Sequence, residues 1–341
     1  MRIRKRHSQG LTAVDLFSGA GGATSGYKLA GVRVVAAVDS DARACDSYEL
    51  NHPEVRLIRR NIHRVAATEV KRLLGRRTLD ILTACSPCTS YSTMRMGKSD
   101  PRDKDLALVV LRFARVLKPR AVVLENVPQL CDDERFERLR GGLEQLGYEV
   151  WFDTIDAASY GVPQRRRRLL LIAQLGAPPL SLPKARVQRT VNMAIRRLDL
   201  RDTLHRSRDL PEKVLARIRA VPLRGGSRSA LPKRLRLACH DRIRRSAATN
   251  VYGRMRSNQP SPTLTTRCTT PSCGRFVHPR ANRPITLREA ACLQTFPRRY
   301  QFAGTRGEVE RQIGNALPAE LARRIALHVG RALARSPRRA S

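Results

Sequence analysis

The feature that most constrains the fold is a repeated alternation between short apolar segments and longer stretches with helical spacing. The apolar segments lie at residues 12–17, 32–39, 56–61, 79–85, 121–127 and 167–174. Residues 105–118 show the clearest helical spacing, and Pro119 follows their end. Alternating strands and helices predict a doubly wound parallel sheet with helices on both faces.

The second half of the chain has a different character. Residues 176–185 are rich in proline, as is typical of a linker, and residues 177–282 show no regular alternation. Helical patterns return at residues 286–294 and 318–335. A chain of 341 residues is long enough for two domains, so we expect one regular domain and one smaller, irregular domain.

The net charge indicates a polyanionic partner. The chain has 66 Lys and Arg residues but only 29 Asp and Glu, which gives a formal charge of +37. Coding from a GC-rich genome would explain abundant Arg and Ala, but not so few acidic residues. We therefore expect the protein to bind nucleic acid.

Cysteine content and apolar runs bear on the cellular compartment. Eight cysteines in a chain of this length give no dense disulfide framework and fit reduced thiols in a cytosol. Asp15 interrupts the first apolar run too early for a signal peptide. No run approaches the roughly 18 apolar residues of a membrane span. We predict a cytoplasmic protein without a membrane span.

A glycine-rich segment, DLFSGAGGATSG at residues 15–26, follows the first predicted strand. Gly19 and Gly21 fit a dinucleotide-binding fingerprint, whereas Thr24 holds the third glycine position. Asp39 ends the second predicted strand, where a carboxylate can accept hydrogen bonds from ribose hydroxyls. The pattern predicts an adenosine-containing cofactor. It leaves NAD and S-adenosylmethionine open, although the missing glycine disfavours a pyrophosphate.

The stretch CSPC at residues 85–88 has three interpretations: a zinc ligand pair, a redox pair, or a single nucleophile. Zinc needs a second ligand pair, and the spacing of Cys268, Cys273 and His278 matches no usual site. A redox pair should open a helix, which this composition disfavours. Cys88 follows the fourth predicted strand and Glu125 ends the fifth, so we expect both at one crevice. That pairing favours covalent catalysis assisted by an acid, with no metal.

Taken in order, the motifs resemble those of the DNA (cytosine-5)-methyltransferases of bacteria and phages. DLFSGAGG resembles the cofactor loop of that family, SPC at 86–88 its Pro-Cys catalytic loop, and ENV at 125–127 its Glu-Asn-Val motif. QRRRR at 164–168 matches its Gln-x-Arg-x-Arg pattern. Residues 283–297 resemble its Arg-Glu helix, and IGNALP at 313–318 resembles its closing Gly-Asn motif. The resemblance covers most of the chain.

The resemblance implies a fold, a division of the chain, a cofactor and partners. The fold would be a mixed, mostly parallel sheet of the S-adenosylmethionine-dependent methyltransferase type. Residues 1–178 and 308–341 would form the catalytic domain, and residues 179–307 a target-recognition domain. The cofactor would be S-adenosylmethionine and the substrate double-stranded DNA in a bacterial cell. A cognate restriction endonuclease would act separately, and the protein would be a monomer.

The resemblance also assigns residues to the site, each at the position that matches a family motif. Catalytic roles would fall to Cys88, Glu125 and Arg166. Cofactor binding would involve Phe17, Ser18, Gly19, Gly21, Gly22, Asp39, Asn61, Ile62, Pro87 and Asn315. DNA contacts would involve Ser90, Ser92, Asn126, Gln164, Arg165, Arg168, Thr263 and Leu264. The loop at residues 88–102 would close over a cytosine flipped out of the duplex.

The sequence departs from the family pattern at a few positions. Thr89 stands where members often have Gln, and Asn61 stands where an Asp usually binds the adenine amino group. GNA replaces the commoner GNS or GNV. Two alternatives stay open: an RNA cytosine-5 methyltransferase with the same chemistry, and a catalytically silent DNA-binding homologue. An NAD-dependent oxidoreductase is disfavoured by the glycine pattern and the charge.

Overall fold

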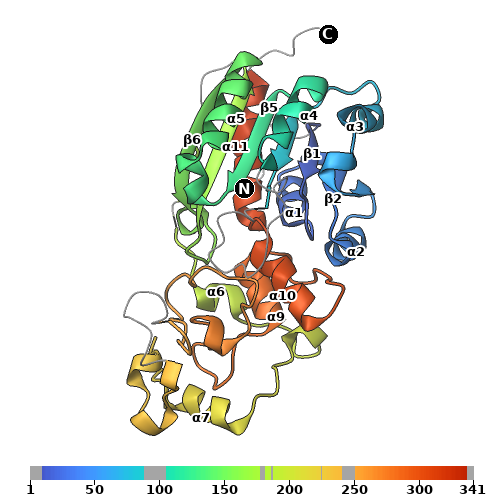
Figure 1. Ribbon diagram of the computed structural model, residues 1–341. Helices are drawn as coiled ribbons and strands as arrows, with labels where there is room; N and C mark the ends of the chain where they lie inside the picture. Colours follow the sequence, from blue (N-terminus) through green and yellow to red (C-terminus); the bar gives the residue numbers. More distant parts are fainter. Residues whose placement is uncertain are drawn as a thin grey trace.

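A computed structural model describes residues 10–87, 105–176, 181–185, 187–223, 225–239 and 250–335. Its centre is a seven-stranded sheet of order β3-β2-β1-β4-β5-β7-β6 (Figure 1). The strands are β1 Thr12–Leu16, β2 Arg33–Asp39, β3 Arg56–Arg59, β4 Ile81–Ala84, β5 Ala121–Asn126, β6 Tyr148–Asp156 and β7 Arg167–Leu175. The first five pair in parallel, whereas β7 runs antiparallel to both β5 and β6.

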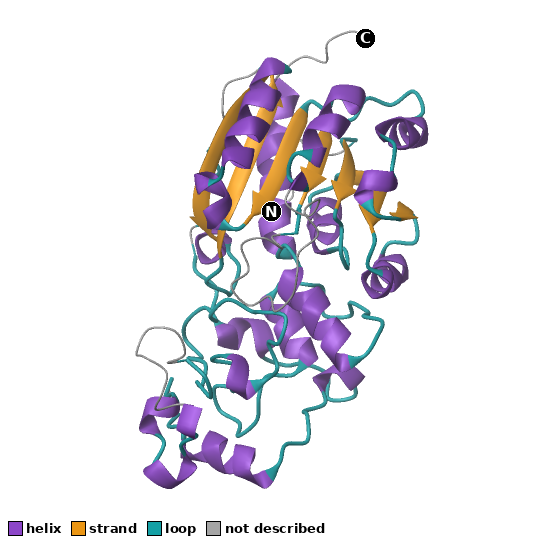
Figure 2. Ribbon diagram, in the orientation of Figure 1, coloured by secondary structure: helices purple, strands orange, loops and turns teal. Residues whose placement is uncertain are grey.

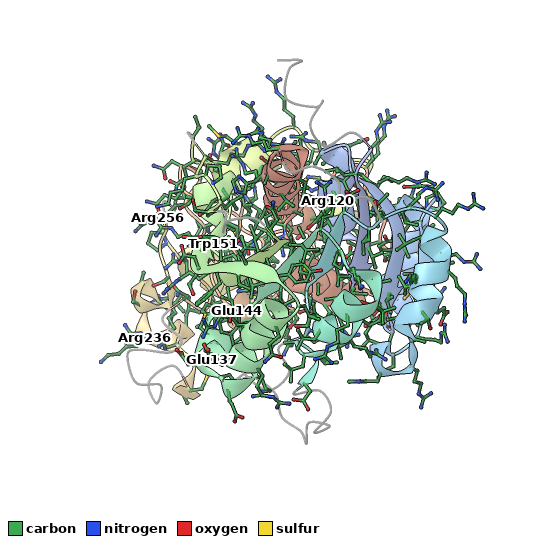
Figure 3. All side chains as sticks on the ribbon, turned by 90° about the horizontal axis from the view of Figure 1, so that it is seen from above. Arg120, Glu137, Glu144, Trp151, Arg236 and Arg256 are labelled. Carbon is green, nitrogen blue, oxygen red and sulfur yellow. The ribbon has the colours of Figure 1, made fainter. Side chains whose placement is uncertain are left out.

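The mixed, mostly parallel sheet is confirmed, and all six predicted strands are present. The sequence analysis missed β6, which lies at the sheet edge and pairs only with β7. Most of its side chains are exposed or half-buried, so it lacks the continuous apolar run that marks the other strands. Trp151 of this strand, labelled in Figure 3, packs against the core that contains Leu321 and Ile325 of the C-terminal helix.

Helices cover both faces of the sheet, and alternate strand residues supply two separate cores. The helices of this part are α1 Gly22–Leu29, α2 Ala42–Asn51, α3 Ala67–Leu74, α4 Val109–Leu117, α5 Glu134–Gln145 and α11 Ala319–Arg335. Val14 and Leu16 point to the core under α3, α4 and α5. Ala13 and Ile81 point to the core under α1 and α11.

The C-terminal helix α11 returns to the sheet and packs closely on α1. A Cβ atom at Gly26 of α1 would lie 2.3 Å from the carbonyl oxygen of Ala319 and 2.7 Å from the amide of Arg323. Only glycine permits this approach of the two helices. The two ends of the described chain therefore share one core, and Figure 1 shows the red helix α11 behind the green strands of the sheet.

The second half of the chain consists of short helices joined by long loops (Figure 2). Its helices are α6 Val191–Ile195, α7 Glu212–Ala220, α9 Leu287–Leu293 and α10 Arg306–Asn315. A third core joins α6, α9 and α10, and a small fourth core lies around Tyr252. Within the described ranges, no helix is both long and apolar enough to cross a membrane.

Near the fourth core, a buried arginine side chain binds several loop carbonyls. Arg254 has no exposed surface. Its guanidinium donates to the carbonyl oxygens of His278, Ala281 and Ile218 at 2.7–3.0 Å, and to the side chain of Asn282 at 2.9 Å. Five donors in a fixed plane can satisfy several loop carbonyls at once, which a helix or sheet would otherwise do. Arg275 likewise donates to the carbonyls of Gly225, Gly226 and Arg254, so two arginine side chains hold the irregular backbone of this region.

Candidate functional site

The carboxyl ends of three central strands meet at one edge of the sheet. Leu16 pairs with Ala84, and Ala84 pairs with Leu124, so the residues after each strand emerge side by side. The antiparallel strand β7 starts at this same edge, where Leu169 pairs with Asn126. The expected crevice edge is therefore formed, and it faces the second half of the chain (Figure 1).

The glycine-rich loop at this edge is tied to the end of β2. The amide of Ser18 donates to the carbonyl of Val38 at 3.1 Å, and the amide of Gly19 donates to Asp39 Oδ2 at 2.7 Å. Asp39 Oδ1 accepts the amide of Asp41 at 2.8 Å. Burial raises the pKa of Asp39, while these amide donors oppose the shift. Loop and carboxylate thus form one rigid unit.

Two features on the outer side of this loop fit a polar ligand. The Ser18 hydroxyl is buried and has no hydrogen-bond partner among the described residues. A Cβ atom at Gly19, where φ is +51°, would meet nothing within 4 Å, so open space lies there. A ligand with hydroxyl or amino groups could satisfy Ser18 and fill this space. The donor and acceptor set fits a nucleoside cofactor.

The remaining predicted cofactor residues lie around this loop. Phe17 has a φ of +58°, a left-handed conformation that turns the chain sharply after β1. Asn61 Oδ1 already accepts the amide of His63 at 2.9 Å, and Ile62 beside it is buried. Asn315 is exposed at the end of α10. Their binding roles stay predictions.

On the inner side of the loop, Gly21 and Gly22 pack closely against the rest of the protein. A Cβ atom at Gly21 would lie 2.7 Å from both the His52 ring and the Tyr300 hydroxyl. A Cβ atom at Gly22 would lie 2.5 Å from the carbonyl oxygen of Leu317. Packing against the body of the protein therefore accounts for glycine at these two positions, and their predicted backbone contacts with a cofactor stay predictions.

At the end of β5, Glu125 contacts an arginine. Arg168 Nε lies 3.0 Å from Glu125 Oε1, and the two side chains are 17% and 8% exposed. The arginine therefore places a positive charge beside a nearly buried carboxylate, although Glu125 Oε1 makes no hydrogen bond within the described residues. The family resemblance gave Arg166 a catalytic role and Arg168 a DNA contact, which would place Arg166 beside Glu125. Instead, Arg166 precedes β7 and its Nη1 donates to the carbonyls of Leu264 and Gly314 at 3.3 and 3.1 Å.

Asn126 holds the segment that leads to the predicted nucleophile. Its Nδ2 donates to Ser86 Oγ at 2.8 Å and to the Ser86 carbonyl at 3.3 Å. The buried Asn126 side chain thereby fixes the residue before Pro87 next to Glu125. Cys88 itself, together with Ser90, Ser92 and the rest of the 88–102 loop, lies outside the described residues.

A buried junction, formed by residues 163–166, residues 261–265, Gln294 and Gly314, joins the two halves. Gln164 is fully buried: its Nε2 donates to Gln294 Oε1 at 2.8 Å, and its Oε1 accepts the amide of Leu264 at 3.0 Å. The exposed Thr263 donates its hydroxyl to the Arg165 carbonyl at 2.7 Å. In this structure Gln164 and Leu264 hold the junction, and their DNA contacts remain predictions.

The sequence analysis gave no role to Gln294, although it lies in the Arg-Glu helix motif. Its Nε2 donates to the carbonyls of Ile313 at 2.6 Å and Ala316 at 3.2 Å. Gly314 is needed beside it, since a Cβ atom there would lie 2.4 Å from the Thr265 carbonyl oxygen. Gln294 is fully buried in the structure, but nothing in the sequence near it indicates this contact with segments far along the chain.

The zinc alternative receives no support from the described part of the chain. No group of three or more His, Cys, Asp or Glu side chains there could hold a metal ion. Cys268 is fully buried, and burial raises the pKa of its thiol. Burial lowers the pKa of His278 to about 4.

Sequence comparison gives consistent relatives along the chain. The family model for C-5 cytosine-specific DNA methylase matches residues 11–331. The Type II methylase M.HgiDII of Herpetosiphon aurantiacus is 36% identical over 342 residues, covering 94% of this chain and 95% of its own. The Type II methyltransferase M1.HphI of Haemophilus parahaemolyticus is 29% identical, covering 93% and 86%.

Solved structures share the fold. A protein described as a DNA modification methyltransferase encoded within an Escherichia coli prophage aligns with a TM-score of 0.74 at 21% identity, covering 95% of this chain and 99% of that one. The S. pombe Dnmt2 methyltransferase aligns with a TM-score of 0.66 at 16% identity, covering 95% and 98%. Both alignments span the sheet and the irregular second half.

Proposed function

The chain belongs to the C-5 cytosine-specific DNA methylase family and is a DNA cytosine-5 methyltransferase. We propose the following mechanism for it. Cys88 forms a transient covalent bond to carbon 6 of a cytosine flipped out of double-stranded DNA, and carbon 5 then accepts a methyl group. The observation that carries the proposal is the adjacent pair at the end of β5. Glu125 contacts Arg168, and Asn126 holds Ser86, two residues before Cys88.

The chemistry requires an activated ring, because carbon 5 of cytosine is a poor nucleophile. The Cys88 thiolate forms a bond to carbon 6, while Glu125 hydrogen-bonds or protonates ring N3 and disperses the developing charge. Carbon 5 then takes the methyl group. Loss of the carbon 5 proton to a base and breakage of the bond between sulfur and carbon 6 restore the thiolate and release 5-methylcytosine.

Glu125 can act only if its carboxylate is oriented toward the base. Arg168, 3.0 Å from Glu125 Oε1, supports that orientation. We propose that Arg168 touches the site directly and that Arg166 acts through the junction, because Arg166 is 2% exposed and its guanidinium is bonded to two carbonyls. This assignment reverses the roles that the sequence suggested for the two arginines.

The cofactor we propose is S-adenosylmethionine, which supplies an electrophilic methyl group when bound. Ser18 and Gly19 would receive its polar portion, since Ser18 Oγ is buried without a partner among the described residues and open space adjoins Gly19. Asp39 would accept the ribose hydroxyls. Phe17, Ile62 and Asn61 would surround the adenine, and Pro87 and Asn315 would border the methionine portion.

The DNA would lie between the sheet edge and the second half of the chain. We propose residues 1–178 with 308–341 as the catalytic domain and 179–307 as the recognition domain, with α10 packed on the latter. Exposed arginines suited to phosphates include Arg201, Arg206, Arg208, Arg234, Arg236 and Arg256. Arg236 and Arg256 lie toward the outside of the molecule (Figure 3). We propose a monomer, with a separate endonuclease cutting the same sequence.

A covalent trap tests the mechanism. In duplex DNA containing 5-fluorocytosine, carbon 5 carries fluorine that cannot leave as a proton, so the adduct persists after methyl transfer. Wild-type protein with S-adenosylmethionine should form a complex that survives denaturing electrophoresis. Cys88→Ser should form none, while Cys239→Ser, at an exposed free cysteine, should trap as well as wild type. A complex formed by Cys88→Ser would reject Cys88 as the nucleophile.

A further inference from the structure

A second cavity lies on the inner side of the cofactor loop, away from the site described above. Its volume is about 340 Å³, and it opens between α1, the end of α2 and the segment after α9. The exposed side chains of Lys28, Leu29 and Arg299 form its rim. The buried side chains of His52 and Tyr300 form its floor.

The rim has the chemistry of a site for an anion with an apolar body. Two cationic side chains, Lys28 and Arg299, line it together with Leu29 and Pro297, and none of its described lining residues is a carboxylate. Glu54, outside the lining, pairs with Lys28. Both partners of that pair are well exposed, and such pairs contribute little, so an incoming anion can displace Glu54.

Hydrogen bonds through His52 link Lys28 at the rim to the residues that contact the cofactor loop. Lys28 Nζ lies 3.1 Å from His52 Nδ1, and because an ammonium group can only donate, Nδ1 accepts and Nε2 carries the ring proton. His52 Nε2 lies 3.0 Å from Tyr300 Oη and 3.3 Å from Ser25 Oγ. A neutral ring is required, and burial and Lys28 lower the pKa of His52 to about 4.

Tyr300 and Ser25, the two residues next to His52 Nε2, are in turn hydrogen-bonded to the backbone of the cofactor loop. Tyr300 Oη donates to the carbonyl of Ala20, and Ser25 Oγ donates to the carbonyl of Gly21 at 2.8 Å. The ring of His52 also touches the position where a Cβ atom of Gly21 would stand. A change at Lys28 therefore reaches two successive carbonyls of the loop that is proposed to hold the cofactor.

We propose that this cavity binds a small organic anion, a carboxylate or phosphate on an apolar body, and that its occupancy weakens binding of S-adenosylmethionine. The anionic group pairs with Lys28 and Arg299, and the apolar body lies on Leu29 and Pro297. Unlike Glu54, which pairs with Lys28 while Lys28 still bonds His52 Nδ1, an anion shared with Arg299 draws the Lys28 ammonium away from His52. The His52 tautomer is then no longer fixed, and the loop carbonyls lose their ordered partners. The effect on the cofactor rests on the proposed function; the cavity site does not.

Phenyl phosphate is a suitable probe, with inorganic phosphate and phenol as its two halves. Calorimetric titration of the full-length protein should show saturable binding of phenyl phosphate, and much weaker binding of either half. Arg299→Glu should weaken it at least tenfold. Arg72→Glu, an equal charge change at an exposed position on α3, should not. Equal losses in both variants, or no saturable binding, would overturn the cavity site.

A second titration tests the coupling. The Kd of S-adenosylmethionine should rise about fivefold or more when phenyl phosphate saturates the wild-type protein, and by the same factor in reverse. In Arg299→Glu the probe should leave that Kd unchanged, which excludes direct competition at the cofactor loop. An unchanged Kd in wild type would overturn the coupling. Failure of S-adenosylmethionine to bind at all, with probe binding intact, would instead count against the proposed function.

Discussion

Replacing Gln164 by Met distinguishes a residue that holds the junction from one that contacts DNA. Methionine has similar volume but neither donates nor accepts strong hydrogen bonds. In Gln164→Met, Gln294 Oε1 would lose its donor at 2.8 Å, and the Leu264 amide would lose its acceptor at 3.0 Å. Each buried group left without a partner costs about 1–3 kcal/mol, so the variant should lose about 2–6 kcal/mol of unfolding free energy.

The functional consequence should be confined to DNA. The junction connects the start of β7, which carries Arg168, to residues 261–265, whereas the cofactor loop makes no contact with Gln164 in the bonds described. Affinity for S-adenosylmethionine should therefore stay at the wild-type value, while kcat/KM for DNA falls.

Urea denaturation and cofactor titration measure the two effects. Gln145→Met, at an exposed position near the end of α5, is the matched control and should change stability by less than about 0.5 kcal/mol. The reasoning is refuted if Gln164→Met is as stable as this control. If it is stable and yet binds DNA poorly, Gln164 is a direct DNA contact, as the family resemblance suggests.

Three further predictions concern packing, pH and the recognition region. Gly26→Ala, whose Cβ would lie 2.3 Å from the Ala319 carbonyl oxygen, should cost about 1–3 kcal/mol or more in thermal unfolding. In the control Gly141→Ala on α5, where a Cβ atom would meet nothing within 4 Å, the free energy of unfolding should rise by about 0.5–1 kcal/mol. If both alanine variants were more stable than wild type, the close contact between α1 and α11 would be contradicted. Burial raises the pKa of Asp15 from 3.8 to about 7. Between pH 3.8 and pH 7 the folded protein therefore binds a proton that the unfolded chain does not, and the free energy of unfolding falls as the pH rises through this range. The free energy of unfolding of Asp15→Asn, measured by urea denaturation relative to wild type, should therefore rise by about 4 kcal/mol from pH 4 to pH 8. A difference between the two proteins that does not change with pH would refute this prediction. Arg254→Met should raise amide hydrogen exchange around residues 218–221 and 278–282 and abolish DNA binding, with cofactor affinity unchanged; protection equal to wild type would show that the arginine is dispensable.

Strands buried on both faces could be predicted because their composition is set by burial alone. Residues 121–126 are buried at every position and form a continuous apolar run up to Glu125. The edge strand β6 mixes exposed, half-buried and buried residues without regular alternation, and it pairs with β7 alone as the chain returns antiparallel. The family resemblance implied a mixed sheet, but it did not say which strand is antiparallel, and periodicity did not either.

The site could be predicted where residues end strands of the parallel sheet. Glu125 and Asp39 are both found in this way, since strand ends converge whatever the loops do. Contacts between distant segments leave no local pattern. Gln164 and Gln294 are 130 positions apart, and Arg166 turns into the junction rather than toward Glu125 because the regular strand begins one residue later.

The central claim, methyl transfer to carbon 5 of cytosine in duplex DNA, is tested most directly by following the methyl group. The purified protein is incubated with tritium-labelled S-adenosylmethionine and either plasmid DNA or RNA, and the products are mapped by bisulfite sequencing and nucleoside analysis. The label should appear only as 5-methylcytosine within one short recurring sequence, and Cys88→Ser should give none. Label on adenine, on the exocyclic nitrogen of cytosine, or in RNA in preference to duplex DNA would contradict the account.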